Sequence, residues 1–243
     1  MMQPEISKIG VNTHPAQTAA IIPAAGFGIR MGGERAKQFL DLNGVPLLAA
    51  TLRPFQSCPE IGAIILVVPS MDVVFCREEI VGRFRLDKVR KVVPGGKRRQ
   101  DSVRLGLEAT EGEFDLVLIH DGVRPVITEE FIGQIVAAAR THRAVITAVP
   151  AKETVKEISD HGEVVRTYDR ERVWLVQTPQ VFRYEDIMAA HQEAIRRGWE
   201  EASDDSLLME RMGISVKVIE GPEQNIKVTT PHDLEMARFL MRQ

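Results

Sequence analysis

A regular alternation of apolar runs and amphipathic segments through residues 19–150 constrains the fold more than any other feature of the chain. The apolar runs lie at residues 19–22, 61–69, 89–93, 114–120 and 144–150, and such continuous hydrophobicity is typical of parallel strands buried on both faces. Segments with helical spacing separate them, at residues 47–55, 71–84, 100–110 and 128–141. This order predicts an α/β fold with a mostly parallel, Rossmann-like sheet and right-handed crossovers. Ligands of such sheets bind at the carboxyl ends of strands, so the loops after the runs are where a site is expected.

Length and composition narrow the class of protein. The 243 residues suit one domain, which we expect at residues 18–243, and residues 1–17, which lack the apolar segment of a secretory signal, are expected to be a disordered extension. A net charge of −3 argues against a nucleic-acid partner, and no apolar run approaches the roughly 20 residues that span a bilayer. Cys58 and Cys76 stand outside any CxxC motif, which argues against a zinc site or disulfide framework and favours a cytoplasmic location.

The first apolar run leads into a stretch of small residues, glycines and cations. Its members in chain order are Pro23, Ala24, Ala25, Gly26, Gly28, Arg30, Arg35 and Lys37. Glycines let the backbone approach a ligand closely, and successive backbone N–H groups bind anions. Arg and Lys just beyond them can hold phosphate oxygens. The stretch therefore predicts a polyphosphate cradle at the carboxyl end of the first strand, with a plain strand-to-loop turn bearing surface charges as the alternative.

Two common phosphate-binding motifs do not fit this stretch. The GxxxxGK[ST] pattern fails because Lys37 is followed by Gln38. The dinucleotide pattern GxGxxG is nearly met by Gly26 and Gly28, but Met31 stands where a small residue would let the helix pack closely. The two cations within seven positions of Arg30, together with Pro23-Ala24-Ala25-Gly26, still favour phosphate binding over a plain turn.

A second glycine loop follows the third run. Gly95 and Gly96 let the backbone approach a ring or ribose, and Ser102 opens the next helical segment, where its hydroxyl can donate to a carbonyl or amide edge. The alternative is a solvated helix N-terminus. That interpretation is preferred for Lys97 and Arg98, although cations at a helix N-terminus oppose its dipole.

Charged residues end the fourth run and follow the last one. Asp121 can ligate Mg²⁺ or accept a sugar hydroxyl, and Arg124 can bind a phosphate or simply hold Asp121 in a structural pair. His120 is interpreted as a packing residue, because in-line phosphoryl transfer between ready-made anions needs no proton abstraction. Lys227 would be a solvated lysine on its own, but it follows a predicted strand at residues 215–219, which directs it toward the same cleft.

The alternation of apolar runs and helical segments is interrupted at residues 151–172, where two polar-rich runs flank Asp160-His161-Gly162. This pattern predicts a protruding β-hairpin arm, which is too poor in apolar residues to be stable alone. A partner subunit or its own domain can cover it, and both possibilities stay open. Beyond it we expect a strand at 174–182 interrupted by Pro179, helices at 184–197 and 204–212, and a last helix that Thr230 caps.

Six short motifs together resemble one family, the 2-C-methyl-D-erythritol 4-phosphate cytidylyltransferases of the non-mevalonate isoprenoid pathway. They are Pro23-Ala24-Ala25-Gly26-x-Gly28-x-Arg30-Met31, Lys37-Gln38, Gly95-Gly96-x-x-Arg99-x-x-Ser102-Val103, His120-Asp121-x-x-Arg124-Pro125, Thr178-Pro179-Gln180 and Asn225-Ile226-Lys227-Val228-Thr229. The resemblance runs in order from about Ala19 to the C-terminus. Each motif alone is weak evidence for this family, but the ordered set of six is specific to it.

The resemblance implies a reaction and a distribution of roles. CTP and methylerythritol phosphate give the CDP-alcohol and pyrophosphate with Mg²⁺, and Asp121 is a tentative metal ligand. It implies three catalytic cations, Arg30, Lys37 and Lys227, and a CTP site made of Pro23, Ala24, Ala25, Gly26, Gly28, Gly96, Ser102 and Asp121. The alcohol phosphate is expected to contact Asp121, Arg124 and Thr178, together with Thr154 and Arg170 from the arm of the neighbouring subunit of a homodimer.

Three departures from the family pattern and three alternative functions accompany the resemblance. Lys97 stands where some members carry an acid, Gly122-Val123 replaces Ala-Ala, and Ala36 replaces the proline before Lys37. The nearest alternative is a ribitol 5-phosphate cytidylyltransferase, which Ala25 disfavours because such relatives open with Ala-Gly-Gly. A Rossmann NAD(P)-dependent oxidoreductase and a non-catalytic ligand-binding module are alternatives of other classes.

Overall fold

A seven-stranded sheet forms the centre of the computed structural model, which describes residues 18–26, 36–199 and 202–242. Its order is β11-β7-β10-β6-β1-β4-β5, and β10 runs antiparallel to both neighbours while the other pairs are parallel. The strands are β1 (Thr18–Pro23), β4 (Ile61–Val68), β5 (Val89–Pro94), β6 (Leu116–Ile119), β7 (Ala144–Pro150), β10 (Trp174–Arg183) and β11 (Lys217–Glu220). The predicted mostly parallel sheet is confirmed.

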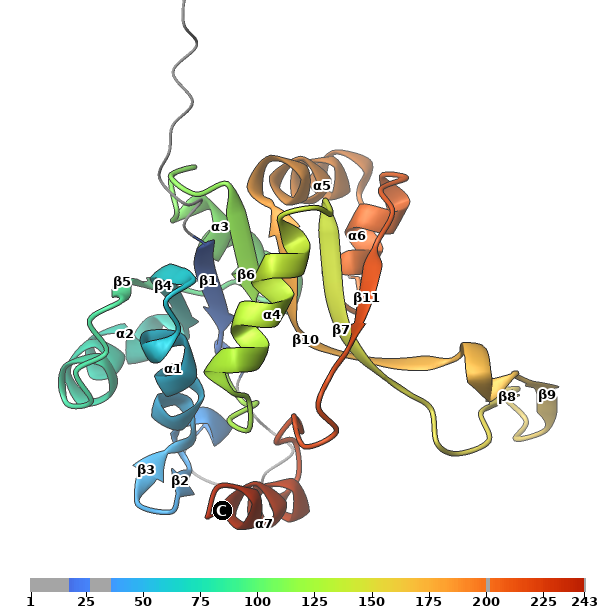
Figure 1. Ribbon diagram of the computed structural model, residues 1–243, viewed down its shortest axis with the longest axis horizontal. Coiled ribbons are helices and arrows are strands. Elements are labelled where there is room, and N and C mark those ends of the chain that lie inside the picture. The colour runs from blue at the N-terminus through green and yellow to red at the C-terminus, as the bar shows by residue number, and fades with distance from the viewer. Residues whose placement is uncertain (1–17, 27–35, 200–201, 243) are drawn as a thin grey trace, which may run out of the picture.

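Helices cover both faces of this sheet (Figure 1). On one face lie α1 (Leu47–Ser57) and α4 (Glu129–Ala139), and on the other α3 (Arg99–Glu108), α5 (Tyr184–Arg197) and α6 (Ser206–Arg211). Strand β1 serves both cores, because Ala20 and Ile22 pack with α1 and α4 while Ala19 and Ile21 pack with α3 and α5. This two-sided burial explains the uninterrupted apolar runs in the sequence.

Two helices begin where the sequence placed their caps. The Thr128 hydroxyl accepts a hydrogen bond of 3.3 Å from the Phe131 backbone N–H at the start of α4. Thr230 accepts one of 3.2 Å from the Asp233 N–H at the start of α7 (Pro231–Leu240). Helix α7 covers a third, smaller apolar cluster, below the sheet in Figure 1, to which the segment that carries Lys227 also contributes.

The predicted helix at residues 71–84 is helical but not uniform. It consists of a 3-10 turn (Ser70–Asp72), one turn of α2 (Val73–Phe75) and a π-helical segment (Cys76–Gly82). Cys76 and Ile80 are buried in the core, and the partly buried Val73, Val81 and Phe84 pack against it. Periodicity at this length predicts a helix but does not distinguish its hydrogen-bonding pattern.

The sequence did not predict the small hairpin of β2 (Asp41–Leu42) and β3 (Val45–Pro46). Asn43 and Gly44 form its turn, with φ angles of 56° and 86°, the geometry of a two-residue β-hairpin loop. Strand β10 runs through Pro179, but its pairing with β7 is interrupted there as predicted, by a register shift between Gln177 and Gln180. The Thr178–Pro179 peptide bond is cis.

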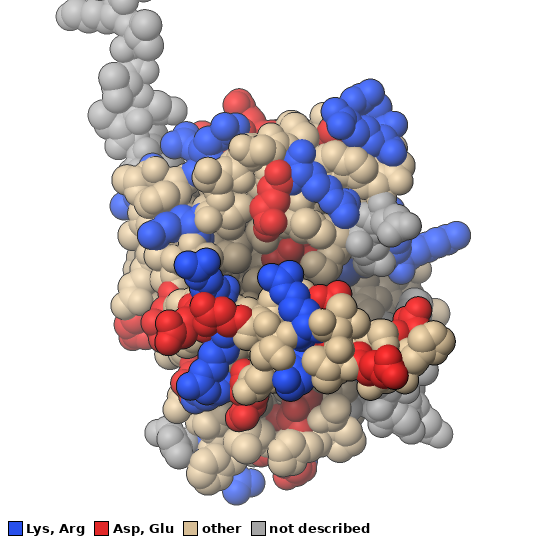
Figure 2. Space-filling view, turned by 90° about the vertical axis from the view of Figure 1, so that its right-hand side faces the viewer, with Lys and Arg blue, Asp and Glu red and all other residues tan. Residues whose placement is uncertain are grey.

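The predicted arm is a β-hairpin of β8 (Lys156–Ile158) and β9 (Val164–Thr167), with Gly162 at φ 80° in its turn. It extends away from the sheet, at the right of Figure 1, instead of folding back on its own domain. Its apolar residues are exposed, Val165 to 61%. Figure 2 looks onto this side of the molecule and shows basic and acidic side chains interspersed, without a continuous field of one sign. Among the described residues, no helix is both long and apolar enough to cross a membrane.

Candidate active site

A cavity of about 250 Å³ lies at the carboxyl ends of β1, β5 and β6. Loops from distant parts of the sequence line it, as expected for a parallel sheet. Of the residues that the sequence singled out, it brings together Pro23, Ala24, Ala25, Gly26, Lys37, Gly96, Ser102, Asp121 and Lys227. Arg30 and Gly28 lie outside the described residues. Gln38 also lines the cavity, from a 3-10 turn (Lys37–Phe39).

The two glycine loops pack directly on each other at this cavity. A Cβ atom on Gly95 would lie 2.3 Å from the Ala25 Cβ, and one on Gly96 would lie 2.4 Å from the Asp101 Cβ. Only glycine permits this approach. The Ser102 hydroxyl accepts a 3.1 Å hydrogen bond from the Gly96 N–H and donates to the Arg98 carbonyl at 3.2 Å, so it fixes the turn from within.

Arg98 is exposed, as the sequence suggested, and it also pairs with a residue in the first turn of α3. Its Nε and Nη2 atoms donate to the Asp101 carboxylate at 3.0 and 2.7 Å, and Asp101 also accepts from the Arg98 backbone N–H. This interaction explains how α3 begins with basic residues, because Asp101 in the first turn compensates their unfavourable interaction with the helix dipole.

A second cavity of about 440 Å³ adjoins the first and shares three of its lining residues, Arg99, Asp121 and Lys227. Arg124 and Thr178, both predicted site residues, line this second cavity only, together with side chains of β10 and of the segment that enters α6. The molecule therefore has two adjoining cavities separated by one charged wall.

Asp121 is the centre of that wall. Its Oδ1 accepts from Arg99 Nε at 3.1 Å, and its Oδ2 lies 2.8 Å from Lys227 Nζ and 3.6 Å from Arg124 Nε. Burial opposes ionisation of the carboxyl, but these three cations outweigh it and hold the Asp121 pKa well below its ordinary range. Asp121 is therefore ionised at any physiological pH, and it orients the cations around it.

A buried hydrogen-bond network holds Asp121 from behind. The Asp121 N–H donates to Thr178 Oγ1 at 3.0 Å, and Asn225 Nδ2 donates to the Thr178 carbonyl at 2.7 Å. Arg124 Nη1 donates to the Asn225 carbonyl at 2.7 Å, which ties the loop that carries Lys227 to the end of β6. The geometry gives Arg124 a structural role, because its side chain is largely buried beside Asp121.

His120 packs behind this network, in agreement with its prediction as a packing residue. Its Nε2 lies 3.1 Å from the Arg124 carbonyl, and its ring centroid lies 5.0 Å from that of Phe55. Complete burial lowers the pKa of His120 to about 4, so the ring is neutral at neutral pH. It lines neither cavity and is not placed to take a proton from a substrate.

Sequence reasoning missed Arg99 and Asp205 as functional candidates. Arg99 Nη1 donates to Asp205 Oδ2 at 2.8 Å, so this guanidinium bridges two carboxylates. Arg99 belongs to a motif that the sequence singled out, but a basic residue at a helix N-terminus has no distinguishing pattern. Asp205 precedes α6 and looks like an ordinary helix-start residue. Only the tertiary fold reveals that they meet.

The described residues fit a magnesium ion only in one way. They contain no cluster of three or more His, Cys, Asp or Glu side chains that could hold a metal. Asp121 is the one carboxylate among the residues that line the smaller cavity. Mg²⁺ is commonly bound by one or two carboxylates together with substrate phosphates and water. The site therefore suits an ion that arrives with a polyphosphate and not an ion caged by the protein.

The predicted arm residues lie apart from these cavities. Thr154 and Arg170 are exposed and line neither of them, and Arg170 Nη1 donates only a long 3.3 Å hydrogen bond to the Lys152 carbonyl. Within one chain the structure does not bring them to Asp121.

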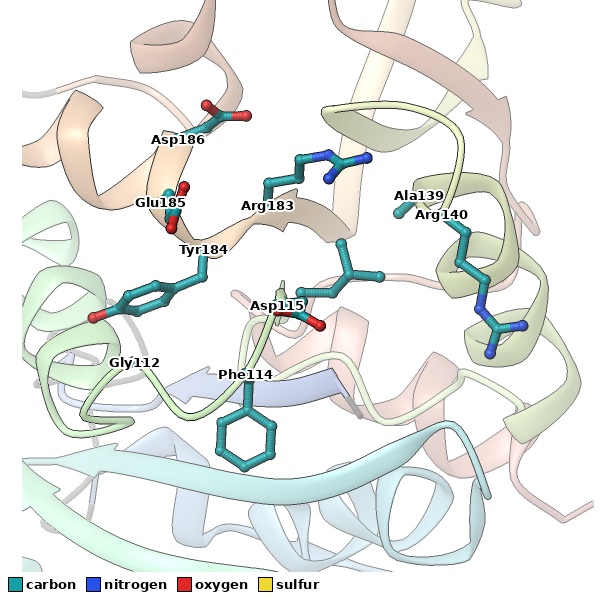
Figure 3. Close-up of a pocket in the computed structure, with 10 residues that line it drawn as sticks. Gly112, Phe114, Asp115, Ala139, Arg140, Arg183, Tyr184, Glu185 and Asp186 are labelled. Atoms are coloured by element: carbon teal, nitrogen blue, oxygen red, sulfur yellow. The ribbon is translucent and has the colours of Figure 1, made fainter. Parts of the chain in front are cut away.

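A third cavity, of about 520 Å³, lies at the opposite end of the sheet, where β6 begins and the antiparallel β10 ends. Figure 3 shows that its charged side chains, among them Arg140, Arg183 and Asp186, point in different directions and not toward one point. None of the predicted site residues lines it. Its size alone does not make it a catalytic site.

Comparisons with known proteins agree with the geometry. The model of the family described as IspD, 2-C-methyl-D-erythritol 4-phosphate cytidylyltransferase, matches residues 18–243. Proteins of that name from Geobacter metallireducens and Syntrophus aciditrophicus are 46% and 44% identical, over 92% and 93% of this chain and 97% and 96% of theirs. A solved 4-diphosphocytidyl-2C-methyl-D-erythritol synthase from Anaerococcus prevotii superposes with a TM-score of 0.82 at 34% identity, covering 93% of this chain and 96% of that one. The cytidylyltransferase from Thermus thermophilus superposes with a TM-score of 0.76 at 32% identity, covering 92% of this chain and 98% of that one.

Proposed function

The chain belongs to the IspD family of 2-C-methyl-D-erythritol 4-phosphate cytidylyltransferases, and from that premise we propose how its own residues transfer the cytidylyl group of CTP to methylerythritol phosphate with release of pyrophosphate. The observation that carries the proposal is the pair of adjoining cavities with one charged wall of Arg99, Asp121 and Lys227. A reaction that joins two anionic substrates needs two such compartments with cations between them.

CTP occupies the smaller cavity. Its proposed contacts are Pro23, Ala24, Ala25, Gly26, Gly28, Gly96, Ser102 and Asp121, and all of them except Gly28 line this cavity. The packed glycine loops support the assignment, since their close contact brings two backbone segments together at the edge of this cavity. Gly28 and the catalytic cation Arg30, which lie outside the described residues, are assigned by the family motif alone.

Methylerythritol phosphate occupies the adjoining cavity, where Asp121, Arg124 and Thr178 meet. Asp121 can accept hydrogen bonds from hydroxyl groups of the alcohol, because its carboxylate stays ionised. Thr154 and Arg170 are proposed to hold the substrate phosphate from the arm of a second subunit. The extended arm and its exposed apolar residues support a homodimer of this kind.

Catalysis consists of positioning and charge neutralisation. The substrate phosphate attacks the α-phosphorus of CTP in line, the bond to the β-phosphate bridging oxygen breaks, and pyrophosphate leaves. Lys227 is proposed to neutralise charge between the two substrates, because its Nζ lies on the shared wall, 2.8 Å from Asp121 Oδ2. Lys37 and Arg30 are proposed to stabilise the triphosphate. The attacking phosphate is already an anion, so no general base is needed.

Two further properties complete the proposal. Asp121 would hold Mg²⁺ together with the nucleotide phosphates, and the ion would supply neutralisation of the triphosphate charge. The enzyme is proposed to work in the cytoplasm, which the buried free thiols of Cys58 and Cys76 suit.

A coupled pyrophosphate-release assay tests the function. With CTP and Mg²⁺, we expect turnover with methylerythritol phosphate and little with ribitol 5-phosphate at equal concentration. Turnover with ribitol phosphate alone would assign the chain to the neighbouring specificity. Titration with NAD(P)H is expected to change neither its fluorescence nor the rate, because the glycine loop does not match the dinucleotide pattern.

A further inference from the structure

Arg99 lies between two carboxylates that come from separate elements. It is the first residue of α3, while Asp121 follows β6 and Asp205 immediately precedes α6. Its Nε donates to Asp121 Oδ1 at 3.1 Å and its Nη1 donates to Asp205 Oδ2 at 2.8 Å. A planar guanidinium bonded through two different nitrogens cannot rotate freely, so Asp205 restricts where Arg99 meets Asp121.

Asp205 itself is out of reach of any substrate. It is 1% exposed and lines neither cavity, whereas Arg99 and Asp121 line both. Burial raises its pKa, but the adjacent Arg99 charge and the His191 ring, whose Nε2 lies 3.6 Å from Asp205 Oδ1, outweigh that effect and the pKa lies below its ordinary value. An ionised carboxylate is thus held in the protein interior, where an unpaired charge would be costly, with Arg99 as its close partner.

The contact with Arg99 determines which Asp121 oxygen is available to Lys227. Because Arg99 engages Oδ1, the other oxygen is left for Lys227, 2.8 Å away. Asp205 and Asp121 together also balance much of the Arg99 charge. Lys227 is less enclosed, with 39% of its side chain exposed, and therefore meets the substrates more readily than Arg99, whose side chain is 25% exposed.

We propose that Asp205 is a positioning residue that holds Arg99 against Asp121 and thereby fixes Lys227 on the wall between the two substrate cavities. This inference rests on the proposed function, because the wall matters only if both cavities hold substrates. Without the Asp205 charge, Arg99 is released from one side and can turn toward the triphosphate. Substrates then still bind, but in a geometry that reacts slowly.

Steady-state kinetics of two Asp205 variants test this role. Asp205→Asn keeps the size but loses the charge, and we expect kcat to fall by about tenfold to a hundredfold with KM for CTP changed by less than about threefold. Asp205→Glu keeps the charge at the cost of an extra methylene, and we expect it to retain more kcat than Asp205→Asn. The reverse order would mean that packing matters at this position and would overturn the proposal.

A double-mutant cycle with Arg99→Lys identifies the route of the effect. If Asp205 acts through Arg99, the double variant has about the same kcat as Arg99→Lys alone. If the two losses multiply, or if Asp205→Asn keeps wild-type kcat, the positioning role is refuted.

Asp186→Asn is the matched control, since it removes a carboxylate from the Arg143–Asp186 pair at the other end of the sheet. Near-UV circular dichroism on each variant verifies that the rates refer to folded protein. If the wild type itself does not turn over CTP and methylerythritol phosphate, the proposed function fails instead.

Discussion

The two ends of the central sheet carry cavities of opposite character. At the carboxyl ends of the parallel strands, Arg99, Arg124 and Lys227 converge on one carboxylate, Asp121, whose side chain is 8% exposed. At the amino ends, the larger cavity is bordered by more separate pairs such as Arg140–Glu60 and Arg143–Asp186, in which each arginine is about half exposed, at 46% and 57%. Figure 3 shows that the Arg140 and Asp186 side chains lie apart and point in different directions.

The difference teaches that shared burial of charges, and not cavity volume, distinguishes the end that we propose as the active site. An isolated pair in water is worth little, because water screens the attraction and the side chains lose freedom. A buried carboxylate with several cations cannot lose one partner without leaving another group uncompensated. The two ends should therefore respond very differently to the same substitution, and each prediction below measures that contrast.

Removing the Asp121 charge should have the largest effect. We expect Asp121→Asn to lower the free energy of unfolding by about 3–5 kcal/mol, since it leaves the largely buried Arg124 without its close carboxylate and takes one of two carboxylates from Arg99. The matched change Asp186→Asn at the amino end should cost much less. Urea unfolding followed by circular dichroism measures both. Equal losses in the two variants would remove the contrast between the two ends.

Removing a cation from the proposed active site should abolish most of the turnover. We expect Lys227→Ala and Lys37→Ala each to lower kcat by at least about a hundredfold, the usual loss when a group that stabilises developing charge is removed. Lys91→Ala is the control, because Lys91 is also a 39% exposed lysine paired with a carboxylate, Glu111, but it lies on β5 outside every cavity described above. Wild-type kcat in either site variant would contradict the assigned roles.

His120 should give the carboxyl end a distinctive pH dependence. Because burial lowers the His120 pKa from 6.5 to about 4, the unfolded chain binds more protons than the folded one between these values. Stability is therefore fully present above pH 6.5 and is lost as pH falls toward 4, by about 3 kcal/mol for a shift of this size.

Urea midpoints measured from pH 7.5 to 4.5 test that dependence. His120→Asn should flatten the slope, whereas His142→Asn, at an exposed histidine of the amino end, should leave it nearly unchanged. Asp121 does not interfere, because its lowered pKa makes it contribute only below about pH 4. An unchanged slope in His120→Asn would show that another group causes the loss.

Most of this architecture could be predicted from the sequence. The apolar runs indicated buried strands because each strand packs on two faces, and Thr128 and Thr230 marked helix starts by local chemistry. The glycine loops and Lys227 could be assigned to one edge because parallel strands bring their carboxyl ends together. These are consequences of short-range patterns and sheet geometry.

Long-range ionic contacts could not be predicted in the same way. Asp205 lies more than a hundred positions after Arg99, and nothing local distinguishes it from the neighbouring Asp204. Likewise Asn225 orders the site through backbone carbonyl groups, which leave no signature in the side-chain pattern. Gly95 was recognisable as a loop glycine, but its contact with Ala25 depends on how two loops pack.

The smallest effect should follow a change in the largest of the three cavities described above. Arg183 lines the amino-end cavity at the end of β10, and its substitution tests whether volume or charge convergence identifies the working end. We expect Arg183→Ala to change kcat and both KM values by less than about twofold, because its side chain reaches no residue of the charged wall and exposed charges contribute little. The same coupled assay measures it beside Lys227→Ala. A tenfold loss in Arg183→Ala with normal circular dichroism would mean that the amino end communicates with catalysis, and the contrast drawn between the two ends would then have to be abandoned.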